Sequence, residues 1–231
     1  NSPCIYWWAL TTGYEVPSGN STLTHLYLQQ GAVDKIITLN SPVTLNTELN
    51  LSSAGAIMRT SNTNLLTLAD NITITGTSSS RFIDGPVAKI GDDEFEFPVG
   101  DVQGSNYVWA PIKMADPGTT TTDEFTAEYF FADPGCSWDP GCSCNLSLLN
   151  KVSGVEYWEM TRISGSICPS VTLNWKDGNR SGISNTDDLI VAHWTGSCWE
   201  SKGAANLTGT SISGTITNSG TDFGSYSPIT L

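Results

Sequence analysis

Positive charge is scarce in this sequence. Ten Lys and Arg residues stand against 23 Asp and Glu residues, which gives a formal net charge of −13 over 231 residues. Nucleic-acid backbones and anionic membrane surfaces are bound by clustered cations, and no such cluster is present, so neither partner is expected. The acidity is typical of a protein that stays soluble in an extracellular medium, or of one that binds divalent cations.

Histidine and long apolar runs are also scarce. His25 and His193 are the two histidines, and His193 lies in the strand-like segment 190–194, where a structural role is expected. No GxSxG, HExxH or phosphate-loop motif is present, and no run of about 18 apolar residues could cross a bilayer. Glu156 and Glu159 are the nearest carboxylate pair, but their odd spacing puts them on opposite faces of a strand. We therefore expect neither an enzyme nor membrane insertion.

Strand-forming residues dominate what is present. Between residues 35 and 80, short apolar runs such as 65–68 and 72–74 recur at intervals of about six to eight residues, separated by Asn, Ser, Gly and Asp. Short strands with small polar corners are typical of a β-solenoid whose rungs stack around a narrow core, and a plain meander is the alternative. The sequence therefore predicts an all-β chain with a short-strand region over 1–80, which begins with an aromatic segment.

Residues 81–231 show longer alternating segments, as in Val171, Leu173 and Trp175, and predict an antiparallel β-sandwich. The segment 82–101 has Gly and Asp turns on either side of 87–90, and is predicted to be a β-hairpin that opens this second unit. The expected strands are 82–90, 94–99, 107–112, 125–131, 155–162, 171–175, 189–194, 211–217 and 225–230.

Cysteine is present in an even number. The six residues are Cys4, Cys136, Cys142, Cys144, Cys168 and Cys198. We expect disulfides, and hence export, although six cysteines allow fifteen pairings. Cys168 with Cys198 is plausible, as is Cys136 with Cys142 or Cys144. A zinc site is the weaker interpretation of the 136–144 cluster, because no second CxxC or nearby histidine completes it.

A series of ordered motifs resembles a module of large secreted surface proteins of Bacteroidota, namely gliding-motility-type adhesins and related type IX secretion cargo. The motifs are FIDGPVAKIG at 82–91, FEFPVGD at 95–101, FTAEYF at 125–130, VEYWEM at 155–160, VTLNW at 171–175, DDLIVAHWTGSCW at 187–199 and SYSPITL at 225–231. The resemblance covers about residues 35–231. It implies export, a β-rich stalk or repeat, and a role in surface structure or adhesion, without catalytic residues. The cysteine-rich loop 136–144 and the segment 1–28 are outside the pattern.

Two kinds of binding residue can be proposed from the sequence. Calcium prefers oxygen donors on bent loops, and the candidates are Asp92, Asp93, Asp101, Asp177, Asn179, Asp187 and Asp188. The same residue types also serve simply as turn formers. The candidates for stacking on sugar rings are Trp7, Trp8, Trp138 and Trp199, although core packing is the competing role for such residues.

Two functions follow as hypotheses. The first is a non-enzymatic extracellular structural or adhesive module, which joins other copies or neighbouring modules end to end through edge strands. The alternative is a carbohydrate-binding module of a secreted protein. No cofactor other than calcium is expected. Asn1 follows no Met or basic leader, so we expect a mature form, a fragment or one module of a longer protein.

Overall fold

The computed structural model describes residues 4–8, 21–29, 36–52, 55–118, 120–135, 149–176, 178–219, 223 and 228–231. Within these ranges the chain forms 21 strands and a single four-residue helix, α1 (Gly178–Ser181), so the all-β prediction is confirmed. No helix in the described part of the chain has the length and apolar character needed to cross a bilayer.

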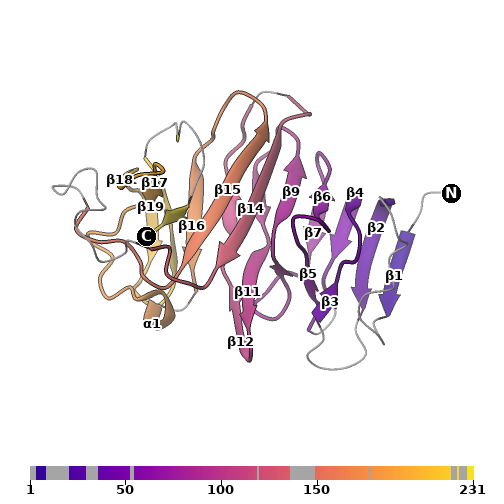
Figure 1. The fold of residues 1–231 in the computed structure, drawn as a ribbon, viewed down its shortest axis with the longest axis horizontal. Coiled ribbons are helices and arrows are strands. Elements are labelled where there is room, and N and C mark those ends of the chain that lie inside the picture. The colour runs from indigo at the N-terminus through magenta and orange to yellow at the C-terminus, as the bar shows by residue number, and fades with distance from the viewer. Residues whose placement is uncertain are drawn as a thin grey trace.

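The largest sheet has eleven strands and extends along the long axis of the molecule (Figure 1). Its order is β1 (Cys4–Trp8), β2 (Ser21–Gln29), β4 (Val43–Asn50), β6 (Leu66–Leu68), β9 (Val87–Ile90), β14 (Glu124–Phe130), β15 (Tyr157–Ser164), β21 (Ile229–Thr230), β17 (Ala192–Trp194) and β18 (Trp199–Ser201), with β7 (Thr73–Thr75) also paired to β4.

Two five-stranded sheets accompany it. One has the order β12 (Asn106–Trp109), β11 (Val99–Gln103), β8 (Ile83–Asp84), β5 (Ile57–Arg59) and β3 (Ile36–Thr38). The other has the order β10 (Phe95–Phe97), β13 (Ile112–Met114), β16 (Val171–Trp175), β20 (Gly214–Thr217) and β19 (Ala205–Gly209).

The first part of the chain is solenoid-like because its strands stack in parallel. β2, β4, β6 and β9 pair in parallel in one sheet, and β3, β5, β8 and β11 do so in another. Leu66 lies opposite Val43 on one side and Val87 on the other, so the inward residues of successive rungs form a ladder. Leu66 and Leu68 are buried and Thr67 between them is half-buried, as the period of a strand requires. Of the two alternatives, the pairing supports the solenoid.

The predicted hairpin over 82–101 is wrong. β9 and β10 lie in different sheets, and β8 pairs in parallel with β11 rather than with a neighbour across a turn. The segment is the last solenoid rung, and Gly91 lies at a corner with φ of +141°. A solenoid corner and a hairpin turn use the same Gly and Asp chemistry, so the local sequence does not distinguish them.

The second part is the predicted antiparallel sandwich. β9 is the point of change, because it pairs in parallel with β6 and antiparallel with β14. From β14 onward the large sheet is antiparallel, and its inner face shares a core with the sheet that contains β16. The expected strands 125–131, 155–162 and 171–175 are confirmed within a few residues, whereas 82–90, 94–99 and 107–112 are each divided between two elements.

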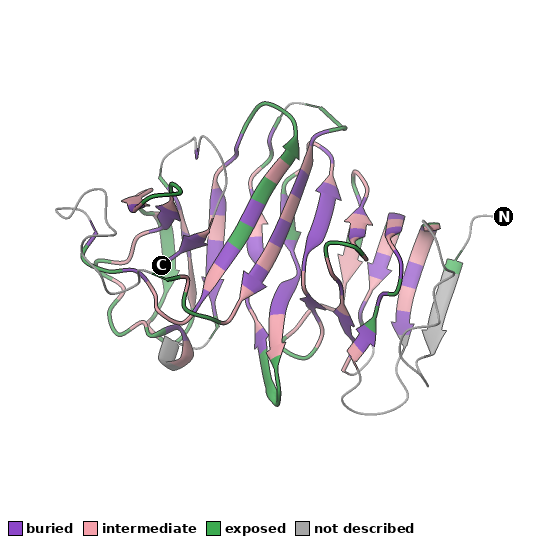
Figure 2. Cartoon of the chain, viewed as in Figure 1, coloured by how far each residue is buried: buried purple, intermediate pink, exposed green. Residues whose placement is uncertain are grey.

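One main hydrophobic core extends from Leu23 to Leu231. Trp158 and Trp175 are its largest fully buried side chains, and the indole Nε1 of Trp158 donates to the carbonyl oxygen of Ala110 at 2.8 Å. Figure 2 shows buried residues alternating with half-buried ones along β14 and with half-buried or exposed ones along the first part of β15. The core and the large sheet both cross residue 80 without a break, and the division into 1–80 and 81–231 stays a prediction.

Candidate functional site

A groove lies in the sandwich half of the molecule, within the described structure. It has a volume of about 760 Å³ and is lined by residues 149–155, 181–185 and 187–190, together with Ala204 and Leu231. Its lining mixes apolar side chains with Ser, Asn and Asp, including two of the predicted calcium ligands, Asp187 and Asp188. The groove therefore offers polar groups to a ligand but no concentrated positive charge.

A buried carboxyl group lies next to two residues of this groove. Glu156 is fully buried between the groove residue Val155 and β15, and its Oε2 accepts a hydrogen bond from the Tyr129 hydroxyl at 2.7 Å. Burial raises the pKa of Glu156, and the nearby Ser181 hydroxyl, the hydrogen bond from Tyr129 and the charge of Arg180 oppose that effect. Thr230 Oγ1 donates to the Glu156 carbonyl oxygen at 2.6 Å. These contacts fasten β14 and the C-terminal strand to the core, which is a structural role.

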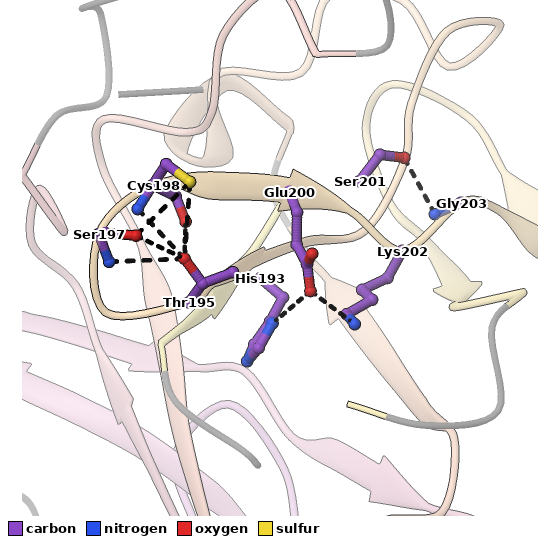
Figure 3. Close-up of polar contacts among 8 residues, drawn as sticks. All are labelled: His193, Thr195, Ser197, Cys198, Glu200, Ser201, Lys202 and Gly203. Atoms are coloured by element: carbon purple, nitrogen blue, oxygen red, sulfur yellow. Dashed lines mark hydrogen bonds and ion pairs between the residues drawn. The ribbon is translucent and has the colours of Figure 1, made fainter. Parts of the chain in front are cut away.

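The β17–β18 hairpin carries a polar network (Figure 3). His193 is 2% exposed, and its Nδ1 lies 3.1 Å from Glu200 Oε1, which also binds Lys202 Nζ at 2.6 Å. The hydrogen bond from Lys202, followed by that from His193, lowers the pKa of Glu200. At the turn, the Thr195 hydroxyl donates to the carbonyl oxygen of Cys198 at 2.9 Å. His193 thus has a carboxylate partner, as expected for a structural strand histidine.

The first set of predicted calcium ligands is engaged by the protein itself. Asp93 Oδ1 lies 2.5 Å from Lys89 Nζ, and the Lys89 side chain is only 1% exposed. Asp101 Oδ2 accepts hydrogen bonds from the backbone N–H of Phe131 at 3.0 Å and from Gln103 Nε2 at 2.9 Å. The Lys89 ammonium therefore occupies the position beside Asp93, the neighbour of Asp92 in sequence, where a metal cation was predicted. Asp101 is engaged separately, by the backbone N–H of Phe131.

The second calcium set is only partly described. Asp187 and Asp188 line the groove, and the backbone N–H of Asp187 donates to Asn185 Oδ1 at 3.1 Å, which is a turn contact. Asp177 and the side chain of Asn179 lie outside the described residues. Among the residues that are described, no group of three or more His, Cys, Asp or Glu is arranged to hold a metal ion. The calcium prediction is therefore not supported in this part of the chain.

One of the suggested cysteine pairings is contradicted by the structure. Cys4 and Cys168 are thiols, whereas Cys198 is disulfide-bonded, so the predicted bond between Cys168 and Cys198 is wrong. Cys168 is buried in the main core and accepts a hydrogen bond from Arg162 Nη1 at 3.1 Å, while Cys198 lies at the turn of the β17–β18 hairpin. The remaining candidates, Cys136, Cys142 and Cys144, lie outside the described residues.

Trp199 is wrong as a residue for stacking on sugars. It is 2% exposed and packs with Leu149, Val152 and Ala192 in a small second core. Trp138 and the side chains of Trp7 and Trp8 lie outside the described residues, so those three predictions are untested.

Sequence reasoning missed a polar patch on the outer face of β14 and β15. Glu128 lies directly opposite Glu159, and Phe130 lies opposite Tyr157 with its ring stacked at 4.7 Å between centroids. Burial, followed by repulsion from Glu159, Asp84 and Asp101, raises the pKa of Glu128 to about 7. The alternation of FTAEYF places Glu128 on the polar face, but only the strand register shows which residue faces it.

No family model, curated protein or solved structure matches the chain. The resemblance to Bacteroidota surface modules therefore rests on the sequence motifs.

Proposed function

We propose that this chain is a non-enzymatic structural or adhesive module of an extracellular surface protein or fibre, and that copies join end to end. The observation that carries the proposal is the eleven-stranded sheet. It extends along the molecule from β1 at one end to β17 and β18 at the other (Figure 1). A sheet that ends in strands at both ends of an elongated molecule can be continued by a second copy.

Both ends have strands at a sheet edge. Among the described strands, β1 pairs only with β2, and β3 pairs only with β5. At the opposite end, β18 and β19 are the last strands of their sheets, and residues 206–209 of β19 are exposed. Edge strands present unpaired N–H and C=O groups that accept another strand. A contact between two different ends is heterologous, and such contacts build open filaments when they do not close into a ring.

Export is supported by the chemistry of Cys198. Its disulfide bond is typical of secreted and surface proteins, because reducing systems keep most cytosolic thiols reduced. The net charge of −13 agrees with a chain that is solvated outside the cell and does not bind nucleic acid.

The test is the mass of the purified chain by light scattering, with electron microscopy of the same sample. We expect open-ended oligomers or filaments. Leu207→Lys places a charge on exposed edge strand β19 and should shorten them, because a charged edge resists strand addition. Ile212→Lys is the matched control, since Ile212 is 70% exposed in a turn outside any strand. A monomer at all concentrations, in the wild type as in both variants, would refute end-to-end assembly.

Carbohydrate binding is a second candidate because of the stacked rings on the outer face. Phe130 and Tyr157 are parallel within 10° and half-buried, and Glu128 and Glu159 lie next to them on the same face. Aromatic rings beside carboxylates suit the apolar faces and hydroxyl groups of a sugar. Glycan screening of the wild type against Tyr157→Ala, with and without calcium, tests this. Absence of any glycan bound more tightly by the wild type would eliminate it.

A further inference from the structure

Four carboxylates influence one another electrostatically where the solenoid joins the sandwich. Glu128 of β14 and Glu159 of β15 are opposite one another in the antiparallel register. Asp84 ends β8 at the last solenoid corner, and Asp101 lies in β11. Both aspartates contribute to the repulsion felt by Glu128. The cluster thus combines carboxylates from the two halves of the molecule.

Asp101 is also the hydrogen-bonding link between these halves. Its Oδ2 accepts from the backbone N–H of Phe131, directly after β14, at 3.0 Å. Gln103 Nε2 donates to the same Asp101 oxygen at 2.9 Å and to the carbonyl oxygen of Phe131 at 2.8 Å. Two of these three bonds join solenoid strand β11 to the residue that follows sandwich strand β14, and the third connects the two side chains of β11. We call the three bonds the junction clamp.

We propose that the junction clamp is pH-sensitive: a proton on Glu128 tightens it, and loss of that proton loosens it. An ionised Glu128 adds a negative charge to a site that already contains Glu159 and Asp101. Asp84 also repels it, but the guanidinium of Arg59 binds the Asp84 carboxylate, with Nη2 at 2.6 Å from Oδ2. Tyr157 is the other titratable group of β15 at this site. Burial, followed by the charges of Glu159, Glu128 and Asp101, raises its pKa.

The direction of the effect follows from the pKa of Glu128. Because burial and repulsion raise it to about 7, the folded protein favours the neutral acid below that pH. The stability that the proton provides is complete below the ordinary carboxyl range and is lost as pH rises through about 7. Asp101 carries the clamp and its charge repels that of Glu128, so the loss is expected in the hydrogen bonds of Phe131 rather than throughout the fold.

Hydrogen exchange of the Phe131 amide, corrected for intrinsic rates, tests the proposal at pH 6 and pH 8.5. We expect its protection to fall about tenfold across this interval in the wild type, which is one pK unit of interaction after solvent screening. Glu128→Gln cannot ionise and should keep the protection constant. Glu124→Gln is the matched control, because Glu124 is on the same face of β14 but opposite Ser164, and should behave as the wild type.

Two results would overturn the proposal. One is a wild-type protection that does not change between the two pH values. The other is an equal fall in Glu128→Gln, which would assign the pH response to another group. Neither measurement depends on assembly, so the proposed joining of copies stands or fails separately.

Discussion

Tyr129→Phe tests the importance of the buried carboxyl group beside the groove. The variant removes one oxygen and keeps the ring, which packs against Trp158 at 5.2 Å between centroids. What it loses is the 2.7 Å hydrogen bond to Glu156 Oε2. Glu156 Oε1 has no hydrogen-bond partner within the described structure, so the variant leaves a buried carboxyl supported by the nearby Ser181 hydroxyl and the charge of Arg180.

The size of the effect depends on the charge of Glu156. A hydrogen bond to a neutral group contributes about 0.5–1.5 kcal/mol and one to a charged group about 1.5–3 kcal/mol. Burial raises the pKa of Glu156, and the Tyr129 bond is one of the contacts that oppose this rise. The pKa of Glu156 is therefore still higher in the variant. Both proteins lose stability as pH rises through the folded pKa of Glu156, and the variant loses more.

Urea denaturation at pH 5 and pH 8.5 measures this difference. We expect a loss of about 1 kcal/mol at the lower pH and a larger loss at the higher one. Tyr107→Phe is the control, because Tyr107 is 37% exposed, and it should stay within about 0.5 kcal/mol of the wild type. A Tyr129→Phe protein as stable as this control at pH 8.5 would show that the reasoning about the buried carboxyl is wrong.

Three further predictions concern stability. Gly91→Ala should cost about 2 kcal/mol or more by thermal denaturation, because φ is +141° and a Cβ would lie within 2.7 Å of polar side-chain atoms of Asp70, Lys89 and Asp93. Gly104→Ala, at φ +63° in open space, should cost about 1 kcal/mol. Trp158→Phe should cost about 1–3 kcal/mol in urea, because its hydrogen bond to the Ala110 carbonyl is lost; a smaller change would mean that water replaces it. Glu200→Gln should lower the free energy of unfolding by less than about 1 kcal/mol at pH 7, because the Glu200 side chain is 35% exposed. This difference should vanish as pH falls through the lowered pKa of Glu200, because the wild-type carboxylate then becomes neutral.

The parts of the fold that were predictable from sequence are those with local signals. The Leu-Thr-Leu alternation at 66–68 identifies a strand with one buried side, and the spacing of such runs predicts stacked rungs. Alternation also identifies β14 and β16. In each case the pattern of burial is set by the period of the strand itself, so neighbouring residues are sufficient to show it.

Predictions that depended on distant partners were less successful. The hairpin at 82–101 was wrong because β9 pairs with β6 and β14, which lie far from it in sequence. The Cys168–Cys198 bond and the exposure of Trp199 depended on how separate elements pack. The pairing of Glu128 with Glu159 depends on the register between β14 and β15, which the sequence of either strand alone does not reveal.

The parallel stacking has a consequence for how such chains can vary. Val43, Leu66 and Val87 are successive partners 23 and 21 residues apart, so each turn of the solenoid repeats the contacts of the one before it. Because a turn touches mainly its neighbours, a whole turn can be inserted or deleted while β9 still offers β14 the same edge. The length of the solenoid can thus change in steps of one turn while the sandwich stays the same.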